Sequence, residues 1–252
     1  MLKIKLLCVS LFALMVIFPS LGQQPVFHRD AISISGGYSL SVGKTINKLF
    51  EDSNGELAGD GYFAQIHYEH KFRHWLGAHL ILNQNINNTR SEAVIDIFKS
   101  KAADFNIPAE ILNALDYDSD AGKWKMLGVY AGPSFHFYPG KFEIDAHASA
   151  GIVKVHSPEV SIKGALGNLR LGEGTLSSAS NSGFGWGLGA SARYPLGDKL
   201  KVFIKAEALA SRVTLENVNI TATANNVSIT QPLNRKQNVG VVNLGVGLLW
   251  GL

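Results

Sequence analysis

Three aspartates alternate with other residues in one stretch of the chain and could bind a calcium ion. Asp116, Asp118 and Asp120 fit positions one, three and five of a calcium loop, where carboxylate oxygens act as ligands. The rest of the pattern fails, because position six is Ala121 instead of glycine and position twelve is Leu127 instead of a bidentate glutamate. The sequence therefore predicts a solvated acidic turn here and no calcium site.

Two histidines, His67 and His79, lie on either side of a short turn and would face each other if the flanking segments were paired strands. Imidazole nitrogens bind zinc and related metals, so the pair suggests a metal site. A zinc site needs at least three protein ligands, and the spacing identifies no third one. We therefore expect both rings to form hydrogen bonds in an interior, and we predict no metal and no other cofactor.

Charged side chains and further histidines alternate with apolar residues next to the short turns. Acidic and basic groups are nearly balanced among them. If they point into one closed interior they must pair, because a charge removed from water carries a heavy desolvation penalty. We predict an interior ion-pair network of Glu69, Lys71, His136, Glu143, Asp145, His147, Arg193, Lys201, Lys205 and Glu207.

The elements that would position these groups are predicted by a strict alternation of apolar and polar residues. In ISISGGYSLSVG, Ile32, Ile34 and Tyr38 share one face and the serines share the other, which is the period of a strand. The same pattern predicts strands at 32–42, 62–72, 76–86, 127–137, 142–152, 184–194, 200–210 and 242–252. Each has about ten residues, the length that a tilted strand needs to cross hydrocarbon.

The connections between these segments alternate in length. Short turns lie at 73–75, 138–141 and 195–198, and long connections at 44–60, 88–124, 156–182 and 213–236. All short turns then fall on one rim and all long loops on the other, as in outer-membrane barrels. In the longest loop we expect a helix that begins with a capping box of Thr89 and Glu92, and a second short helix near Pro108.

Aromatic residues gather at the ends of the predicted strands, with aliphatic residues between them. Two such girdles are typical of a band that contacts a membrane. The predicted girdle residues are Tyr62, Phe72, Trp75, Trp124, Tyr138, Phe142, Phe184, Trp186, Tyr194 and Trp250.

The N-terminus reads as a secretory signal peptide. Lys3 and Lys5 precede an apolar run at 6–18 that is too short to span a bilayer, and small residues before 23 fit a cleavage site. We predict a signal peptide at 1–22, a periplasmic segment at 23–30 and one barrel domain at 31–252. Removal of two of the 23 basic residues leaves near balance with 20 acidic ones, so nucleic acid is not an expected partner.

The chain resembles the small eight-stranded outer-membrane barrels, the OmpA/OmpX-like and porin-family domains, over roughly 31–252. The resemblance rests on YEHKFRHWLGAHL, YAGPSFHFYPGKFEIDAHASAG, ARYPLGDKLKVFIKAEA and the final strand. It implies an all-β fold, an eight-stranded antiparallel transmembrane β-barrel with short periplasmic turns and long extracellular loops. It also implies the outer membrane of a Gram-negative bacterium as the location, with membrane lipid and lipopolysaccharide as partners. Such barrels usually end on an aromatic residue that the barrel-assembly machinery reads, whereas this chain ends on Leu252 with its aromatic at Trp250. The resemblance implies that Leu248, Trp250 and Leu252 form the assembly signal.

Three functions remain open at this point. We expect a structural barrel with a plugged lumen that displays its loops for surface binding or adhesion to an extracellular ligand, without catalysis. The alternative is a small-solute diffusion channel. A remote alternative is a lipid-modifying enzyme, because the spacing of His147 and Ser149 resembles that in lipid A deacylase barrels. Alternation points both of these side chains inward, away from lipid, which disfavours that activity.

Overall fold

Eight long antiparallel strands make up most of the structure, a computed structural model that describes residues 27–42, 57–103, 116–166, 169–224 and 227–252. The strands are β1 (Asp30–Ser41), β2 (Ala58–Arg73), β3 (Leu76–Thr89), β5 (Trp124–Phe137), β6 (Glu143–Ser157), β9 (Ala179–Pro195), β10 (Leu200–Ala224) and β11 (Val227–Gly251). The predicted signal peptide, most of 44–60 and the helix expected near Pro108 lie outside the described residues.

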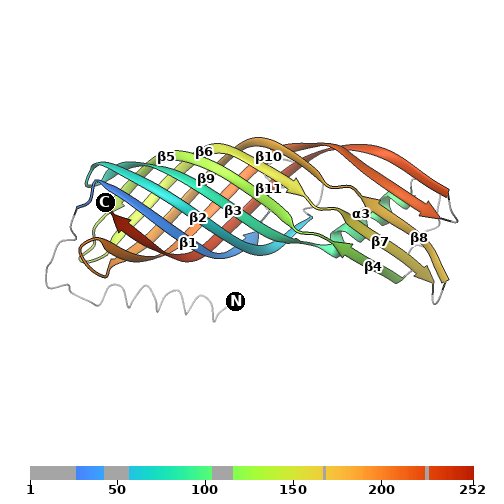
Figure 1. Cartoon of the computed structure of the whole chain (residues 1–252), viewed down its shortest axis with the longest axis horizontal. Helices are drawn as coiled ribbons and strands as arrows, with labels where there is room; N and C mark the ends of the chain where they lie inside the picture. Colours follow the sequence, from blue (N-terminus) through green and yellow to red (C-terminus); the bar gives the residue numbers. More distant parts are fainter. Residues whose placement is uncertain (1–26, 43–56, 104–115, 167–168, 225–226) are drawn as a thin grey trace.

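The eight strands close into a ring. Each strand pairs with the next of the eight along the chain, and β1 pairs with both β2 and β11. The closing seam runs from Ala31 opposite Gly251 to Ser41 opposite Val241. This is the barrel that the alternation predicted, and the fold class is confirmed (Figure 1).

Short turns gather at one end of the barrel. They join β2 to β3, β5 to β6 and β9 to β10, and the C-terminus lies at the same end (Figure 1). The turn between β5 and β6 contains Gly140 with φ of 66°, a left-handed conformation that glycine adopts without strain. The alternation of short and long connections is therefore as predicted.

At the opposite end the long connections form a sheet, where the sequence predicted loops. Beyond the barrel, β10 and β11 continue as a hairpin up to Ala224 opposite Val227. Three short strands extend this hairpin in the order β10, β8 (Leu169–Leu176), β7 (Val160–Leu166) and β4 (Asp116–Ala121). We call this five-stranded sheet the distal sheet. It corrects the prediction of an acidic turn, because Asp116, Asp118 and Asp120 lie on a strand with their side chains exposed.

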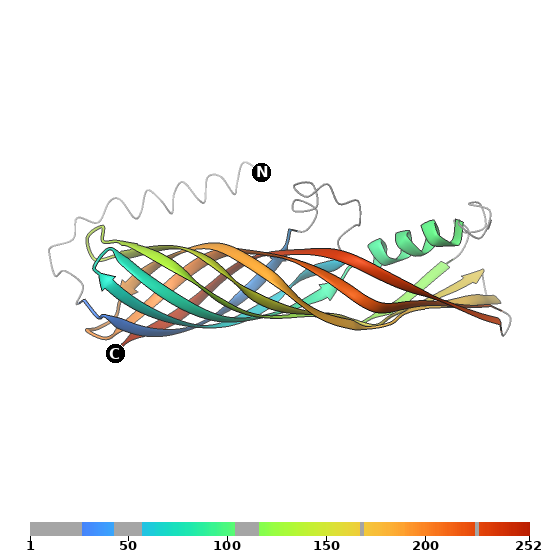
Figure 2. The same ribbon diagram turned by 90° about the horizontal axis from the view of Figure 1, so that it is seen from above.

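One helix, α3 (Ser91–Ala103), covers one face of the distal sheet (Figure 2). Its Val94 is buried in a cluster with Val160 and Ile162, because the apolar residues of these strands turn toward the helix. The predicted capping box is wrong: the Thr89 hydroxyl donates to the carbonyl of Gly122 at 2.6 Å instead of to the helix. In the described residues, no helix has the length and apolar character to cross a membrane.

The two faces of the barrel wall differ as alternation predicts. Outward positions are apolar and exposed, among them Ile34, Ile152 and Val246, which are 63%, 69% and 62% exposed. Of the predicted girdle, seven aromatics are exposed on this outer side and two, Tyr138 and Phe142, are partly exposed. Trp124 is a correction, since it is only 3% exposed and packs in the interior. It lies three residues before the outward Leu127, so alternation puts it on the inner face.

The outer face generates a first prediction. If it contacts lipid, Val246→Arg will lower the free energy of unfolding by about 2 to 4 kcal/mol, because a charge would enter hydrocarbon. Thr230→Arg is the matched control: it puts the same side chain on the same strand, beyond the barrel, and should change stability by less than about 0.5 kcal/mol. Denaturant unfolding in lipid vesicles measures both. Equal stability of the two variants would contradict a lipid-facing Val246.

A second prediction concerns α3. Val94→Asp puts a carboxylate without a partner into the apolar contact with the distal sheet, so the helix should detach. Limited proteolysis should then cut within 91–103 earlier than in the wild type, while the barrel keeps its resistance to heat in gel electrophoresis. Asp96→Ala, on the exposed side of the same helix, should leave the cleavage pattern unchanged. If Val94→Asp also leaves it unchanged, the helix contact contributes little.

Candidate functional site

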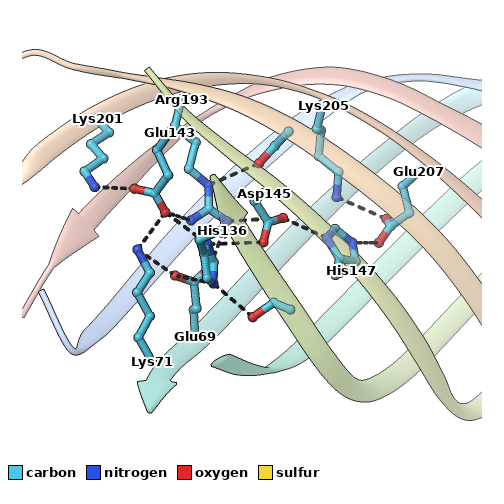
Figure 3. A network of polar contacts seen from close by, with 12 residues as sticks. Glu69, Lys71, His136, Glu143, Asp145, His147, Arg193, Lys201, Lys205 and Glu207 are labelled. Atoms are coloured by element: carbon cyan, nitrogen blue, oxygen red, sulfur yellow. Dashed lines mark hydrogen bonds and ion pairs between the residues drawn. The ribbon is translucent and has the colours of Figure 1, made fainter. Parts of the chain in front are cut away.

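Glu143, on β6, is the centre of a buried network inside the barrel (Figure 3). Its Oε1 lies 2.6 Å from Lys71 Nζ and 2.9 Å from Arg193 Nη1, and its Oε2 lies 2.5 Å from Lys201 Nζ. His136 Nδ1 approaches the same Oε1 at 3.2 Å. Three cations around one carboxylate leave excess positive charge, which other carboxylates must balance.

Arg193 supplies the link to those carboxylates. Besides Glu143, its guanidinium reaches Glu69 Oε2 at 2.8 Å and Asp145 Oδ1 at 3.4 Å, both through Nη2. Lys71 Nζ also lies 3.3 Å from Glu69 Oε1. A planar guanidinium with several donors can bridge three carboxylates in this way, whereas a lysine acts as a point charge.

A second part of the network follows from Asp145. His147 Nδ1 lies 2.8 Å from Asp145 Oδ1, and its Nε2 lies 3.2 Å from Glu207 Oε1. Lys205 Nζ lies 3.1 Å from Glu207 Oε2 and also donates to the side-chain oxygen of Gln65. The structure thus brings all ten predicted residues into one connected network, with four carboxylates, four permanent cations and two histidines.

The half of the interior nearer the distal sheet is filled differently, by apolar packing that was not predicted from the sequence. Buried apolar side chains from several strands form one cluster there, including Ile81, Tyr130, Val153 and Leu209. The signal was present, because β5 and β6 carry apolar residues on both faces in this half, with Met126 and Val155 pointing inward. Apolar packing therefore adds to the ionic network in closing the lumen.

Buried asparagine side chains form a second hydrogen-bonded group in the interior. Asn85 Nδ2 donates to Ser39 Oγ at 2.9 Å and to Asn243 Oδ1 at 2.7 Å, which links β3 to β1 and β11. Asn87 Nδ2 donates to the carbonyl of Gly59 at 2.9 Å. These hydrogen bonds connect strands that are not neighbours in the sheet, so this part of the interior is also occupied by side chains.

Inward glycines make room for the large side chains, but mostly not for the charged ones. A Cβ on Gly189 would lie 2.4 Å from His147, as expected for the network. At Gly185 and Gly247, in contrast, the space is taken by Val153 with Tyr130 and by Phe203. The inward glycines thus accommodate an ionic side chain in one part of the interior, and aromatic and aliphatic groups elsewhere.

A small cavity remains beside the network, lined among others by Ser33, His67, Arg193 and Lys205. The centre of a water molecule can occupy about 10 Å³ of it, which is about the space that one water needs. A cavity of this size suits one water molecule, which would form further hydrogen bonds with the side chains of the network. A passage for a solute would need a far larger continuous space.

His147 and Ser149 both point into the lumen and are 6% and 7% exposed. Both ring nitrogens of His147 contact carboxylates, so neither faces Ser149. A nucleophile needs a base within hydrogen-bond reach and access to its substrate. If lipid covers the outer face, the barrel wall itself separates an acyl ester from Ser149.

The residues of the predicted assembly signal share the outer face of the last strand. Leu248, Trp250 and Leu252 are all exposed, and Trp250 lies opposite Ile32 in the seam. Their side chains are therefore accessible from outside the barrel.

Comparisons with known proteins give a likeness in shape. No protein-family model matches the sequence, and a search of curated proteins finds no match. Among solved structures, the chain is similar to Neisserial surface protein A, with a TM-score of 0.43 and 10% identity over 88% of this chain and 97% of that one. It is also similar to Ail, the attachment invasion locus protein of Yersinia pestis, with a TM-score of 0.41 and 13% identity over 89% and 100%. For the outer membrane protein OprG from Pseudomonas aeruginosa the values are 0.43 and 9% over 91% and 100%.

The network generates a third prediction. Arg193→Met removes the cation that Glu69, Glu143 and Asp145 share, so unfolding in lipid vesicles should require about 3 to 5 kcal/mol less than in the wild type. Arg73→Met, at an exposed position beside a short turn, should cost less than about 0.5 kcal/mol. A wild-type value for Arg193→Met would show that the carboxylates do not depend on the guanidinium.

Proposed function

We propose that this protein is an outer-membrane anchor with a closed lumen, which holds the distal sheet and α3 beyond the membrane surface for contact with an extracellular ligand. The observation that supports the closed lumen best is that two kinds of packing occupy the described interior and leave beside the network a cavity of about the size of one water. The ion-pair network fills the half near the short turns, and the apolar cluster fills the other half. An eight-stranded barrel is only wide enough for side chains to fill, so no continuous pore remains.

The outer wall supports insertion into a membrane. Large apolar side chains are exposed all around the barrel, including Leu80, Leu188 and Ile204 on different strands. Lipid would cover this surface, and the closed ring satisfies the backbone groups that lipid cannot. Membrane lipid and lipopolysaccharide are thus the proposed partners of the wall. The barrel-assembly machinery would meet the exposed Leu248, Trp250 and Leu252 on β11 after a cleaved signal peptide delivers the chain.

The face of the distal sheet that α3 leaves uncovered supports a binding role. Tyr117 and Ala121 turn toward the helix, so the three aspartates of β4 turn to the other face. Hydroxyl pairs continue that face, with Thr221 and Thr230 at 3.0 Å and Thr223 and Ser228 at 2.9 Å. A flat polar surface on rigid strands suits recognition of a hydrophilic surface ligand.

Membrane insertion is tested by fractionation. The protein should stay with membranes through alkaline and high-salt washing and should run at a different gel mobility before and after heating. A soluble two-layer sandwich would be released into the wash, and that result would overturn the anchor.

A fourth prediction separates the anchor from the diffusion channel. Purified protein in planar bilayers should give no steady conductance, because both halves of the lumen are packed. A known porin in the same bilayers is the positive control, and Tyr130→Ala combined with Leu209→Ala tests whether the apolar half can be opened. Reproducible wild-type channels would make the diffusion channel the better assignment. Hydrolysis of lipid A by the wild type, lost in Ser149→Ala, would instead establish an enzyme.

A further inference from the structure

Three imidazole rings meet inside the barrel, and the third was not evident from the sequence. His67 comes from β2, His79 from β3 and His147 from β6. Their ring centres are 5.3 Å apart for His67 and His79, 4.9 Å for His79 and His147, and 5.8 Å for His67 and His147. All three side chains are more than nine-tenths buried.

Two of the rings lack the hydrogen bonds that the sequence predicted for them. Within the described part of the chain, Nε2 of His67 and both ring nitrogens of His79 have no hydrogen-bond partner. A buried polar atom without a partner destabilises a fold, and native structures almost always satisfy such atoms. These nitrogens therefore need a bound partner, either a water molecule that forms hydrogen bonds with them or a metal ion that they coordinate.

The spacing of the rings fits a metal ion. With a metal–nitrogen distance of about 2.0 to 2.1 Å, each ring centre lies about 3.2 Å from the ion, and tetrahedral directions then place the centres about 5.2 Å apart. The observed separations of 4.9, 5.3 and 5.8 Å bracket this value. As the rings stand, their nitrogens do not form a set of ligand atoms within 4.8 Å of one another, so binding would require the rings to turn in place until one nitrogen from each points to a shared position.

The surroundings of His147 also fit ligation. A histidine that binds a metal usually gives its other N–H to a carboxylate, which fixes the ring. Nδ1 of His147 lies 2.8 Å from Asp145 Oδ1 in this way. Nε2 lies 3.2 Å from Glu207 Oε1, so an ion that replaces a proton on Nε2 would find a carboxylate next to it as a fourth ligand.

We propose that His67, His79 and His147 bind one divalent transition metal ion such as zinc inside the barrel, with Glu207 completing a tetrahedral set. This site is separate from the anchoring role, and its test does not depend on that role. Closed tetrahedral coordination by protein side chains alone is typical of structural zinc, so the ion would join β2, β3, β6 and β10 from within.

A different group of ligands in the interior is less suitable. Glu69, His136 and Glu143 have ligand atoms within 4.8 Å of one another, the one such set of three among the described residues. Lys71, Arg193 and Lys201 already neutralise these carboxylates at 2.5 to 2.9 Å. A cation there would have to displace three fixed positive charges, whereas the nitrogens of His79 are free to accept one.

The test uses the full mature chain, refolded with excess zinc because the closed interior limits entry afterwards. After gel filtration, elemental analysis should find one zinc per chain, and refolding with cobalt should give the visible absorption of tetrahedral Co²⁺. His79→Leu and His67→Leu should each lose the metal. Since the His79 ring has no hydrogen bond to lose, metal-free His79→Leu should be at least as stable as metal-free wild type.

His74→Leu is the control, since this exposed histidine lies on a short turn away from the interior. It should retain one zinc per chain. Wild type that retains no zinc and shows no tetrahedral cobalt spectrum would overturn the proposal, and water would then be the partner of the histidine nitrogens. Equal retention by wild type and His79→Leu would place the metal elsewhere and overturn it as well. If the leucine variants do not fold, the wild-type spectrum decides alone, because a three-nitrogen cobalt site absorbs differently from an oxygen site.

Discussion

Pairing of the first strand with the last one closes the sheet, from Ala31 opposite Gly251 to Ser41 opposite Val241. Without this seam, β1 and β11 would each present a row of unpaired N–H and C=O groups along a wall whose outer face is apolar. Water cannot satisfy those groups if lipid covers the wall, so an open sheet would not be stable there. Closure also fixes the diameter, and with it the volume that the inward side chains must fill.

The inward side chains fill that fixed volume by matching the size and charge of their neighbours. Tyr130 fits because Gly128 and Gly185 face its ring, where a Cβ would lie 2.4 Å and 3.1 Å from ring atoms. Charged side chains fill the other half, and each carboxylate there has a lysine or arginine nitrogen within 3.4 Å. Size and charge are therefore matched at particular positions, and a change at one position leaves its partner with a void or an unpaired charge.

Most of the barrel was predictable from the sequence, because a period of two assigns each residue of a strand to one face. That rule placed Glu143, Arg193 and Glu207 inside correctly. It also puts Trp124 inside, and the girdle prediction for this residue was wrong because it followed the residue type instead of the position. Which carboxylate meets which cation was not predictable, since it depends on the stagger between strands that are far apart in the chain. For the same reason His147 could not be recognised as a neighbour of His79.

The distal sheet was missed for a different reason. Its strands are short, and segments such as Val160–Leu166 and Leu169–Leu176 contain glycine and charged residues that are also common in loops. They form strands because β10 continues beyond the barrel and offers a free edge from Ile220 to Thr223. The local sequence of β7 and β8 does not reveal this free edge, since the edge belongs to β10, which is distant in the chain.

The continuity of β10 and β11 has a mechanical consequence. Each strand has 25 residues, which at about 3.3 Å per residue is roughly 80 Å of extended backbone. The pairing of the two strands is interrupted once, by a bulge in β10 between Leu215 and Val218, where the barrel meets the distal sheet. Hydrogen bonds of an antiparallel pair lie across the strands, so a pull along the hairpin loads many of them in shear at once instead of one after another. A ligand that pulls on the distal sheet would therefore transmit its load into the wall of the barrel, and the bulge in β10 is the place where the two parts could bend relative to each other.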